Sequence, residues 1–172
     1  MNNGNELNQL LPGQPLRVGV DLIADKHSGA LIVIVTSNKL DKISSGGINL
    51  IDCAYSPEML SELSKMDGAI IVDDSVTKIL KANVHLNPSD SITTTQTGTR
   101  HRTAERTSAM TGLTVIAVSE ETSLIKVFEN FKTIELEESS AILAKVNESL
   151  QSVDRMRRRF DDAVTTLSLI HI

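Results

Sequence analysis

Short apolar runs alternate with helical patterns along most of the chain. Three runs, at residues 30–35, 68–72 and 114–118, are rich in Val, Ile and Ala. They are too short for isolated helices and are typical of central strands buried on both faces. Less regular strands are predicted at residues 78–84 and 124–128. Helices are predicted at residues 16–26, 57–65 and 102–110, where apolar side chains recur at helical spacing or a proline suits the first turn.

This alternation predicts an α/β fold, in which helices flank a mixed central β-sheet. Residues 1–15 are polar and are predicted to form a flexible N-terminal arm, and residues 16–138 to form the folded domain. Residues 139–172 carry apolar side chains three and four positions apart, which predicts a long amphipathic C-terminal helix, or two helices in series. The last residues show no stop signal, so we expect the helix to begin a longer helical linker.

Composition narrows the class of protein. The 172 residues are 40% hydrophobic but only 2% aromatic, so one compact domain with an aliphatic core is expected. A net charge of −5 argues against a free-standing nucleic-acid binder, although a locally basic pocket remains open. The single cysteine, Cys53, excludes an intrachain disulfide and fits a reducing compartment. Because neither a secretory signal nor a membrane-length apolar run is found, we expect a cytoplasmic protein without membrane contact.

A polar loop leads into the most distinctive group of side chains. Residues 87–99 lack a periodic apolar pattern and predict a long loop of the kind that often carries function. At its end, where a helix begins, stand Thr99, Arg100, His101, Arg102 and Thr103. The first turn of a helix has unpaired N–H groups and a positive dipole end, and Arg can grip phosphate oxygens with two hydrogen bonds. The segment therefore predicts a phosphate site. The alternative is a solvated basic turn that pairs with nearby carboxylates.

Two acidic segments lie beside predicted buried strands. Asp67-Gly68-Ala69 opens one strand, where the carboxylate could bind a divalent metal or polarise a hydroxyl. Gly68 would let a ligand approach the backbone closely. Ser119-Glu120 follows another strand, and ligands of α/β sheets gather beyond strand ends. Ordinary turns are the alternative interpretation of both segments.

Four segments in order resemble the DisA family of diadenylate cyclases. They are Ser-Ser-Gly-Gly at 44–47, Lys-Met-Asp-Gly-Ala-Ile at 65–70, Ala-Asn-Val-His-Leu at 82–86 and Thr-Gly-Thr-Arg-His-Arg-Thr-Ala-Glu-Arg at 97–106. The resemblance runs from about residue 16 to residue 128 and rests on the Asp-Gly-Ala and Arg-His-Arg motifs together. It implies the diadenylate cyclase fold and a nucleotidyltransferase. Such an enzyme condenses two ATP molecules, one on each of two facing subunits, into cyclic di-AMP and releases two pyrophosphates.

The resemblance also implies roles for single residues. Asp67 is expected to be catalytic, working with Mg²⁺ or Mn²⁺ to activate the ribose 3′-hydroxyl for attack on the α-phosphate, with Glu120 as a further metal ligand. Leu86 is expected to pack on the adenine. The full set expected to contact ATP is Gly68, Ala69, Leu86, Thr99, Arg100, His101, Arg102, Thr103 and Ser119.

Family members form octamers, so the resemblance also implies self-association. Full-length relatives continue into a helix-hairpin-helix domain that binds DNA. Nothing after Phe160 supplies that domain, so DNA binding is not expected of this chain. Two alternatives stay open: a non-catalytic ATP-binding sensor, and an assembly module in which the long helix matters most.

Overall fold

The computed structural model describes residues 7–35, 38–129 and 131–170. The chain divides into two compact units, Met1–Leu136 and Glu137–Ile172. Every strand of the described residues belongs to the first unit, and the second contains one long helix.

The first unit is built on a mixed eight-stranded sheet. Its order is β2-β5-β4-β1-β6-β7-β8, with β3 also paired to β5. β1 and β4 are parallel, and every other pair is antiparallel. The strands are β1 Ala30–Val35, β2 Ser44–Ser45, β3 Ile48–Asn49, β4 Ala69–Asp73, β5 Ile79–Leu86, β6 Val115–Val118, β7 Ile125–Glu129 and β8 Lys132–Leu136.

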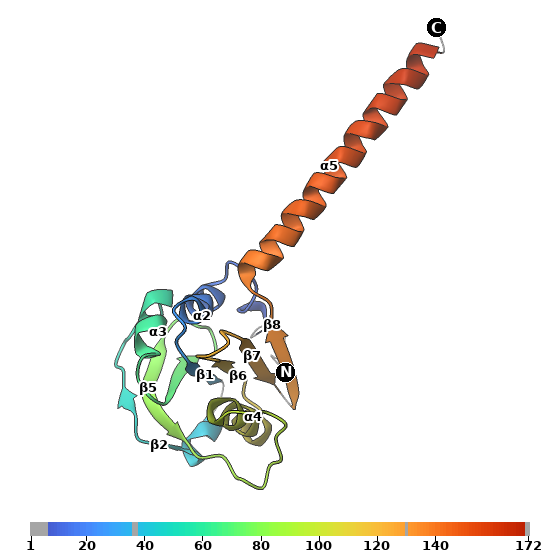
Figure 1. The fold of residues 1–172 in the computed structure, drawn as a ribbon. Coiled ribbons are helices and arrows are strands. Elements are labelled where there is room, and N and C mark those ends of the chain that lie inside the picture. The colour runs from blue at the N-terminus through green and yellow to red at the C-terminus, as the bar shows by residue number, and fades with distance from the viewer. Residues whose placement is uncertain (1–6, 36–37, 130, 171–172) are drawn as a thin grey trace. The chain divides into compact units, whose positions relative to one another are not determined.

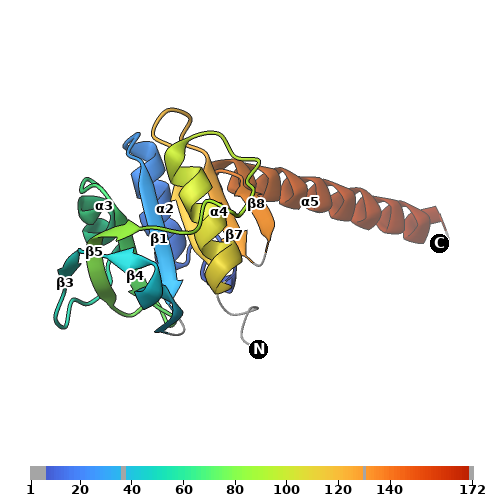
Figure 2. The same cartoon turned by 90° about the horizontal axis from the view of Figure 1, so that it is seen from below.

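Helices cover both faces of this sheet. α2 (Pro15–Asp25) and α3 (Pro57–Leu63) lie on one face and α4 (Thr99–Thr111) on the other, as Figures 1 and 2 show. A short 3₁₀ helix, Asn38–Lys42, follows β1. Alternate side chains of β1 enter two separate cores, with Ile32 and Ile34 toward α2 and Leu31 and Val33 toward α4. Burial on both faces explains why β1 is apolar without interruption. The predicted mixed sheet with flanking helices is confirmed.

Most predicted elements are present, with shifted ends. α2 buries Leu16, Val20, Ile23 and Ala24 on one side, as the helical spacing predicted. α4 begins three residues earlier than predicted, which places Thr99, Arg100 and His101 in its first turn. The short strands β2 and β3 and the strand β8 were not predicted. β2 and β3 are only two residues long, and β8 is mostly exposed, so none of them shows a buried apolar run.

Part of the segment predicted as a flexible arm, residues 1–15, packs on the domain. Leu10 is buried against the core on the α2 side, and Leu7 packs on the same core. Burial of these two leucines removes apolar surface from water, which holds the segment against the domain. Residues 1–6 of the predicted arm lie outside the described residues.

The second unit is α5, a continuous helix over Ser139–Ile170. The predicted long C-terminal helix is therefore confirmed, as one helix and not two. None of its described side chains is buried, and apolar residues such as Val146, Leu150 and Val153 face solvent in this single chain. None of the helices in the described residues combines the length and apolar character that crossing a bilayer requires.

Candidate functional site

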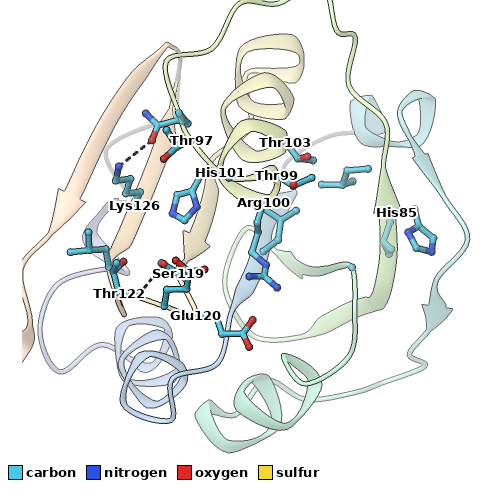
Figure 3. A pocket seen from close by; sticks show the side chains of 18 residues that line it. His85, Thr97, Thr99, Arg100, His101, Thr103, Ser119, Glu120, Thr122 and Lys126 are labelled. Atoms are coloured by element: carbon cyan, nitrogen blue, oxygen red, sulfur yellow. Dashed lines mark hydrogen bonds between the residues drawn. The ribbon is translucent and has the colours of Figure 1, made fainter.

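A pocket of about 1020 Å³ opens at one end of the sheet, where β5 and β6 end and β1 and β4 begin. This volume is at the upper end of the range of about 300–1,000 Å³ that is typical of small-molecule sites. Figure 3 shows the side chains that line it. They are Leu31, Gly68, Val84, His85, Leu86, Gln96, Thr97, Gly98, Thr99, Arg100, His101, Thr103, Ser119, Glu120, Glu121, Thr122, Leu124 and Lys126.

The first turn of α4 forms one wall. Gly98 precedes the helix with a φ of 81°, and no side chain caps the helix N-terminus. The Arg102 N–H donates to the Gly98 carbonyl over 3.1 Å, so the regular helical bonds begin there. The N–H groups at the start of α4, before Arg102, have no acceptor within the helix. Together with the helix dipole they favour binding of an anion.

The loop that leads into α4 is tied to the helix at two points. Arg106 donates from Nε to the Ile92 carbonyl over 3.0 Å and pairs through Nη1 with Asp90 at 2.5 Å. Thr94 donates its hydroxyl to the Glu105 carboxylate. The alternative interpretation had the basic turn pair with nearby carboxylates. Glu105 does not do so, because its hydrogen-bond partner is Thr94 and not an arginine of that turn.

Arg100 extends from the first turn of α4 across the pocket floor to the loop before β1. A Cβ atom added at Gly29 would lie 2.0 Å from Nη1 of Arg100 and 2.5 Å from its Cζ. The guanidinium therefore rests directly on the Gly29 backbone. Only a residue without a side chain leaves room for it in this position. Nothing in the sequence around Gly29 indicates this contact.

Gly68 forms the opposite wall, where β4 begins beside β5. Its φ is +99°, and an added Cβ would come within 2.9 Å of the Asn83 carbonyl carbon and the Val84 oxygen. The pairing of β4 with β5 shifts register just after this point, between Ala69 and Ile71. Both the backbone conformation and the close approach of β5 thus require glycine at position 68.

His101 packs edge-on against Phe128, with ring centroids 6.5 Å apart and an interplanar angle of 75°. Partial burial lowers the pKa of His101, and the positive charges of Lys126 and Arg100 lower it further. Both effects disfavour the protonated imidazole. Two cations, Arg100 and Lys126, thus lie close enough to His101 to lower its pKa.

The turn between β6 and β7 closes the pocket from a third side. The Ser119 hydroxyl accepts a hydrogen bond from the Thr122 N–H over 3.2 Å, and the Ser119 N–H donates to the Leu124 carbonyl over 2.9 Å. Ser123 fastens the turn to the end of α2, because its hydroxyl donates to the Ala24 carbonyl over 2.9 Å. The turn thus holds Ser119 and Glu120 at a fixed place beside the first turn of α4.

The acidic residues near the pocket are few. Glu120 and Glu121 line it and are exposed, while Asp67 is exposed and directly precedes the lining residue Gly68. No group of three or more His, Cys, Asp or Glu side chains in the described residues could enclose a metal ion. Mg²⁺ usually takes one or two carboxylates together with substrate phosphates and water. The residues present therefore fit a metal that arrives with a phosphorylated ligand and not a preformed metal cage.

The structure brings most of the predicted site residues together. Eight of them line the pocket: Gly68, Leu86, Thr99, Arg100, His101, Thr103, Ser119 and Glu120. Three do not line it. Asp67 and Arg102 are exposed outside the lining, and the Ala69 side chain is buried in the core on the α4 side. Sequence reasoning missed Gln96 and Lys126, although a lysine between the apolar residues Ile125 and Val127 was a possible signal.

Comparison with known proteins agrees with this arrangement. Residues 17–133 match the family described as "DisA bacterial checkpoint controller nucleotide-binding". The chain is 43% identical over 163 residues to the DNA integrity scanning protein DisA of Acidothermus cellulolyticus, covering 95% of this chain and 44% of that protein. It is 42% identical over 164 residues to the protein of the same name from Clostridioides difficile, covering 95% and 46%. The chain therefore spans about half the length of the curated relatives it matches.

Solved structures share the fold. The crystal structure of a double mutant of DacA from Staphylococcus aureus is 30% identical, with a TM-score of 0.60, and the match covers 77% of this chain and 91% of that one. A hypothetical membrane spanning protein from Bacillus cereus is 23% identical with a TM-score of 0.63, which shows likeness of fold alone. The resemblance drawn from the Asp-Gly-Ala and Arg-His-Arg motifs is confirmed: this chain belongs to the DisA nucleotide-binding family.

Proposed function

We propose that this chain is a diadenylate cyclase domain, a nucleotidyltransferase that joins two ATP molecules into cyclic di-AMP. One observation carries the proposal. The two motifs of the family, which begin 33 positions apart at Asp67 and Arg100, contribute Gly68 and the first turn of α4 to the walls of one pocket. The membership in a nucleotide-binding family and the likeness to DacA support the same reading.

The pocket offers separate regions for the parts of ATP. The phosphates fit the first turn of α4, where N–H groups, Arg100 and the hydroxyls of Thr99 and Thr103 provide donors. The adenine fits the apolar side of the pocket, where Leu86 is only partly buried and free to pack on a base. This placement puts the ribose between the α4 wall and the Gly68 wall.

Each of the two steps of the reaction forms one P–O bond and breaks another. The ribose 3′-oxygen of one ATP attacks the α-phosphorus of the other, the 3′-hydroxyl proton is removed, and pyrophosphate leaves. Asp67 is proposed to accept or orient that proton. Arg100 stabilises charge on the phosphate oxygens and aligns them with the nucleophile. Mg²⁺ or Mn²⁺, held by Asp67 and Glu120 together with the phosphates, would supply further neutralisation of that charge.

The product has two-fold symmetry, so two copies of the site are proposed to face each other. Asp67 and Arg102 are exposed and lie outside the pocket lining of a single chain. That position suits groups that contact the nucleotide only when a second subunit is present. Assembly into octamers and a cytoplasmic location stay predictions.

The test is direct. The purified chain is incubated with ATP and Mg²⁺ or Mn²⁺, and cyclic di-AMP and pyrophosphate are followed by mass spectrometry. We expect product from the unaltered chain and none from Asp67→Asn, which should still bind ATP because it leaves the α4 wall intact. Cyclisation by Asp67→Asn at the unaltered rate would show that Asp67 is not the catalytic residue.

Two other outcomes would favour the alternatives. ATP binding by a paired chain without any product would indicate a nucleotide sensor. Absence of any thermal stabilisation by ATP would indicate an assembly module and would overturn the proposal altogether.

A further inference from the structure

Lys126 is the cation of β7 and stands between the apolar residues Ile125 and Val127. Its neighbours Ile125 and Val127 are buried in the core on the α2 side of the sheet, so Lys126 projects to the α4 side. There it lines the pocket and is partly buried. A lysine in this position loses hydration, which is unfavourable unless a polar or anionic partner replaces the water.

The partner present in the chain is neutral. Lys126 Nζ donates to Oε1 of Gln96 over 3.1 Å, which supplies a hydrogen bond but no negative charge. Within the described part of the chain, neither Lys126 nor Arg100 pairs with a carboxylate. Both cations act on His101, which lies between them in Figure 3. The pocket is also lined by Glu120 and Glu121, and Glu135 lies opposite Lys126 on β8, but none of them forms an ion pair with either cation in the described part of the chain.

We infer that Lys126 is a phosphate-binding residue, which contacts the polyphosphate of the bound nucleotide from β7 while Arg100 contacts it from α4. The inference rests on the proposed function and adds a residue to its site. An anion with several charges can bind two neighbouring cations that form no ion pair within the chain, and lysine binds phosphate as a compact point charge. Lys126 thus favours a nucleotide with a phosphate tail over the nucleoside.

A purely structural role makes a different prediction. If Lys126 served only to tie the loop at Gln96 to β7, removing either partner would disturb the loop in the same way. Lys126→Met keeps most of the aliphatic stem and removes the charge, while Gln96→Ala removes the tie and keeps the charge. Lys132→Met is a matched control, because Lys132 is exposed on the neighbouring strand β8 and does not line the pocket.

The experiment measures the affinity of the whole chain for adenosine, ADP and ATP by calorimetry, with thermal unfolding to verify folding. For Lys126→Met we expect ATP affinity to fall by on the order of tenfold or more, because one charge-assisted contact is lost. Adenosine affinity should stay within about twofold, and the salt dependence of ATP binding should become less steep. Lys126→Arg should retain most of the ATP affinity. Gln96→Ala should preserve the preference for ATP over adenosine, and Lys132→Met should leave all three affinities unchanged.

The experiment distinguishes failure of the role of Lys126 from failure of the proposed function. If the unaltered chain binds ATP and Lys126→Met binds it equally well, the role of Lys126 is refuted and the proposed function stands. If Lys126→Met and Gln96→Ala weaken adenosine and ATP alike, Lys126 is only a loop tie. If the unaltered chain does not bind ATP, the proposed function and this inference both fail.

Discussion

The contact between Gly29 and Arg100 lets a single added methyl group probe the proposed phosphate site. Gly29 lies in the loop between α2 and β1, and its backbone is outside the left-handed region, so alanine can adopt the same conformation. The atoms that the new Cβ would meet are Nη1, Cζ and Nη2 of Arg100, at 2.0, 2.5 and 2.8 Å. All three belong to the far end of a flexible side chain. The guanidinium, and not the backbone, would therefore give way.

The displacement can be worked out from these distances. For Nη1 to move from 2.0 Å to the 3.4 Å of an ordinary contact, it must shift by about 1.4 Å. A hydrogen bond of about 2.9 Å to a phosphate oxygen would then exceed the limit of about 3.5 Å at which such a bond is lost. Hydrogen bonds to charged groups contribute about 1.5–3 kcal/mol, so Gly29→Ala should weaken ATP binding by roughly 10- to 100-fold.

Stability should move the other way. Alanine restricts the unfolded chain more than glycine does, so where the native conformation suits it, the free energy of unfolding rises by about 0.4–1 kcal/mol. A variant that binds ATP less tightly and unfolds no more easily would separate the loss of Arg100 geometry from general damage to the fold.

The assay is calorimetric titration with ATP, combined with urea unfolding, in a double-mutant cycle with Arg100→Ala. If Gly29 acts only through the Arg100 guanidinium, Gly29→Ala should have no further effect on ATP affinity once Arg100 is alanine. The reasoning is refuted if ATP affinity does not change in the single variant. It is equally refuted if the loss persists in full without the arginine.

Three further predictions concern the same pocket. The pKa of His101 lies below its ordinary value of 6.5, so the unfolded chain binds the proton more readily than the folded chain. The free energy of unfolding, measured with urea, should therefore fall as the pH drops from 6.5 toward the folded-state pKa. His101→Asn should abolish this part of the pH dependence. Gly68→Ala should lower the free energy of unfolding by about 1–3 kcal/mol, since it combines a φ of +99° with a backbone clash; an unchanged urea midpoint would contradict the close approach of β5. Arg100→Ala should weaken ATP binding at every protein concentration, whereas Arg102→Ala, which is outside the pocket lining, should weaken it only at concentrations where subunits pair; equal effects of both in a dilute monomer would argue against that division.

The sequence by itself determined the elements whose signal is local. β1 and β6 were predicted from short apolar runs, because a strand covered on both faces must be apolar throughout. The buried side of α2 followed from helical spacing. Thr99 to Thr103 were predicted to form one site because they are consecutive at a helix start, and all but Arg102 line the pocket.

Only the tertiary structure decided which distant segments meet. Gly29 supports Arg100 across 71 positions of the chain, and Lys126 bonds Gln96 across 30. The catalytic role of Asp67 stays a prediction, since Asp67 lies outside the pocket lining of the single chain. The physical reason is general. The periodicity of apolar residues shows which side of one helix or strand is buried. The strand order and the packing of loops at the end of the sheet are set by contacts between remote segments, and such contacts leave no periodic pattern in the sequence of either segment.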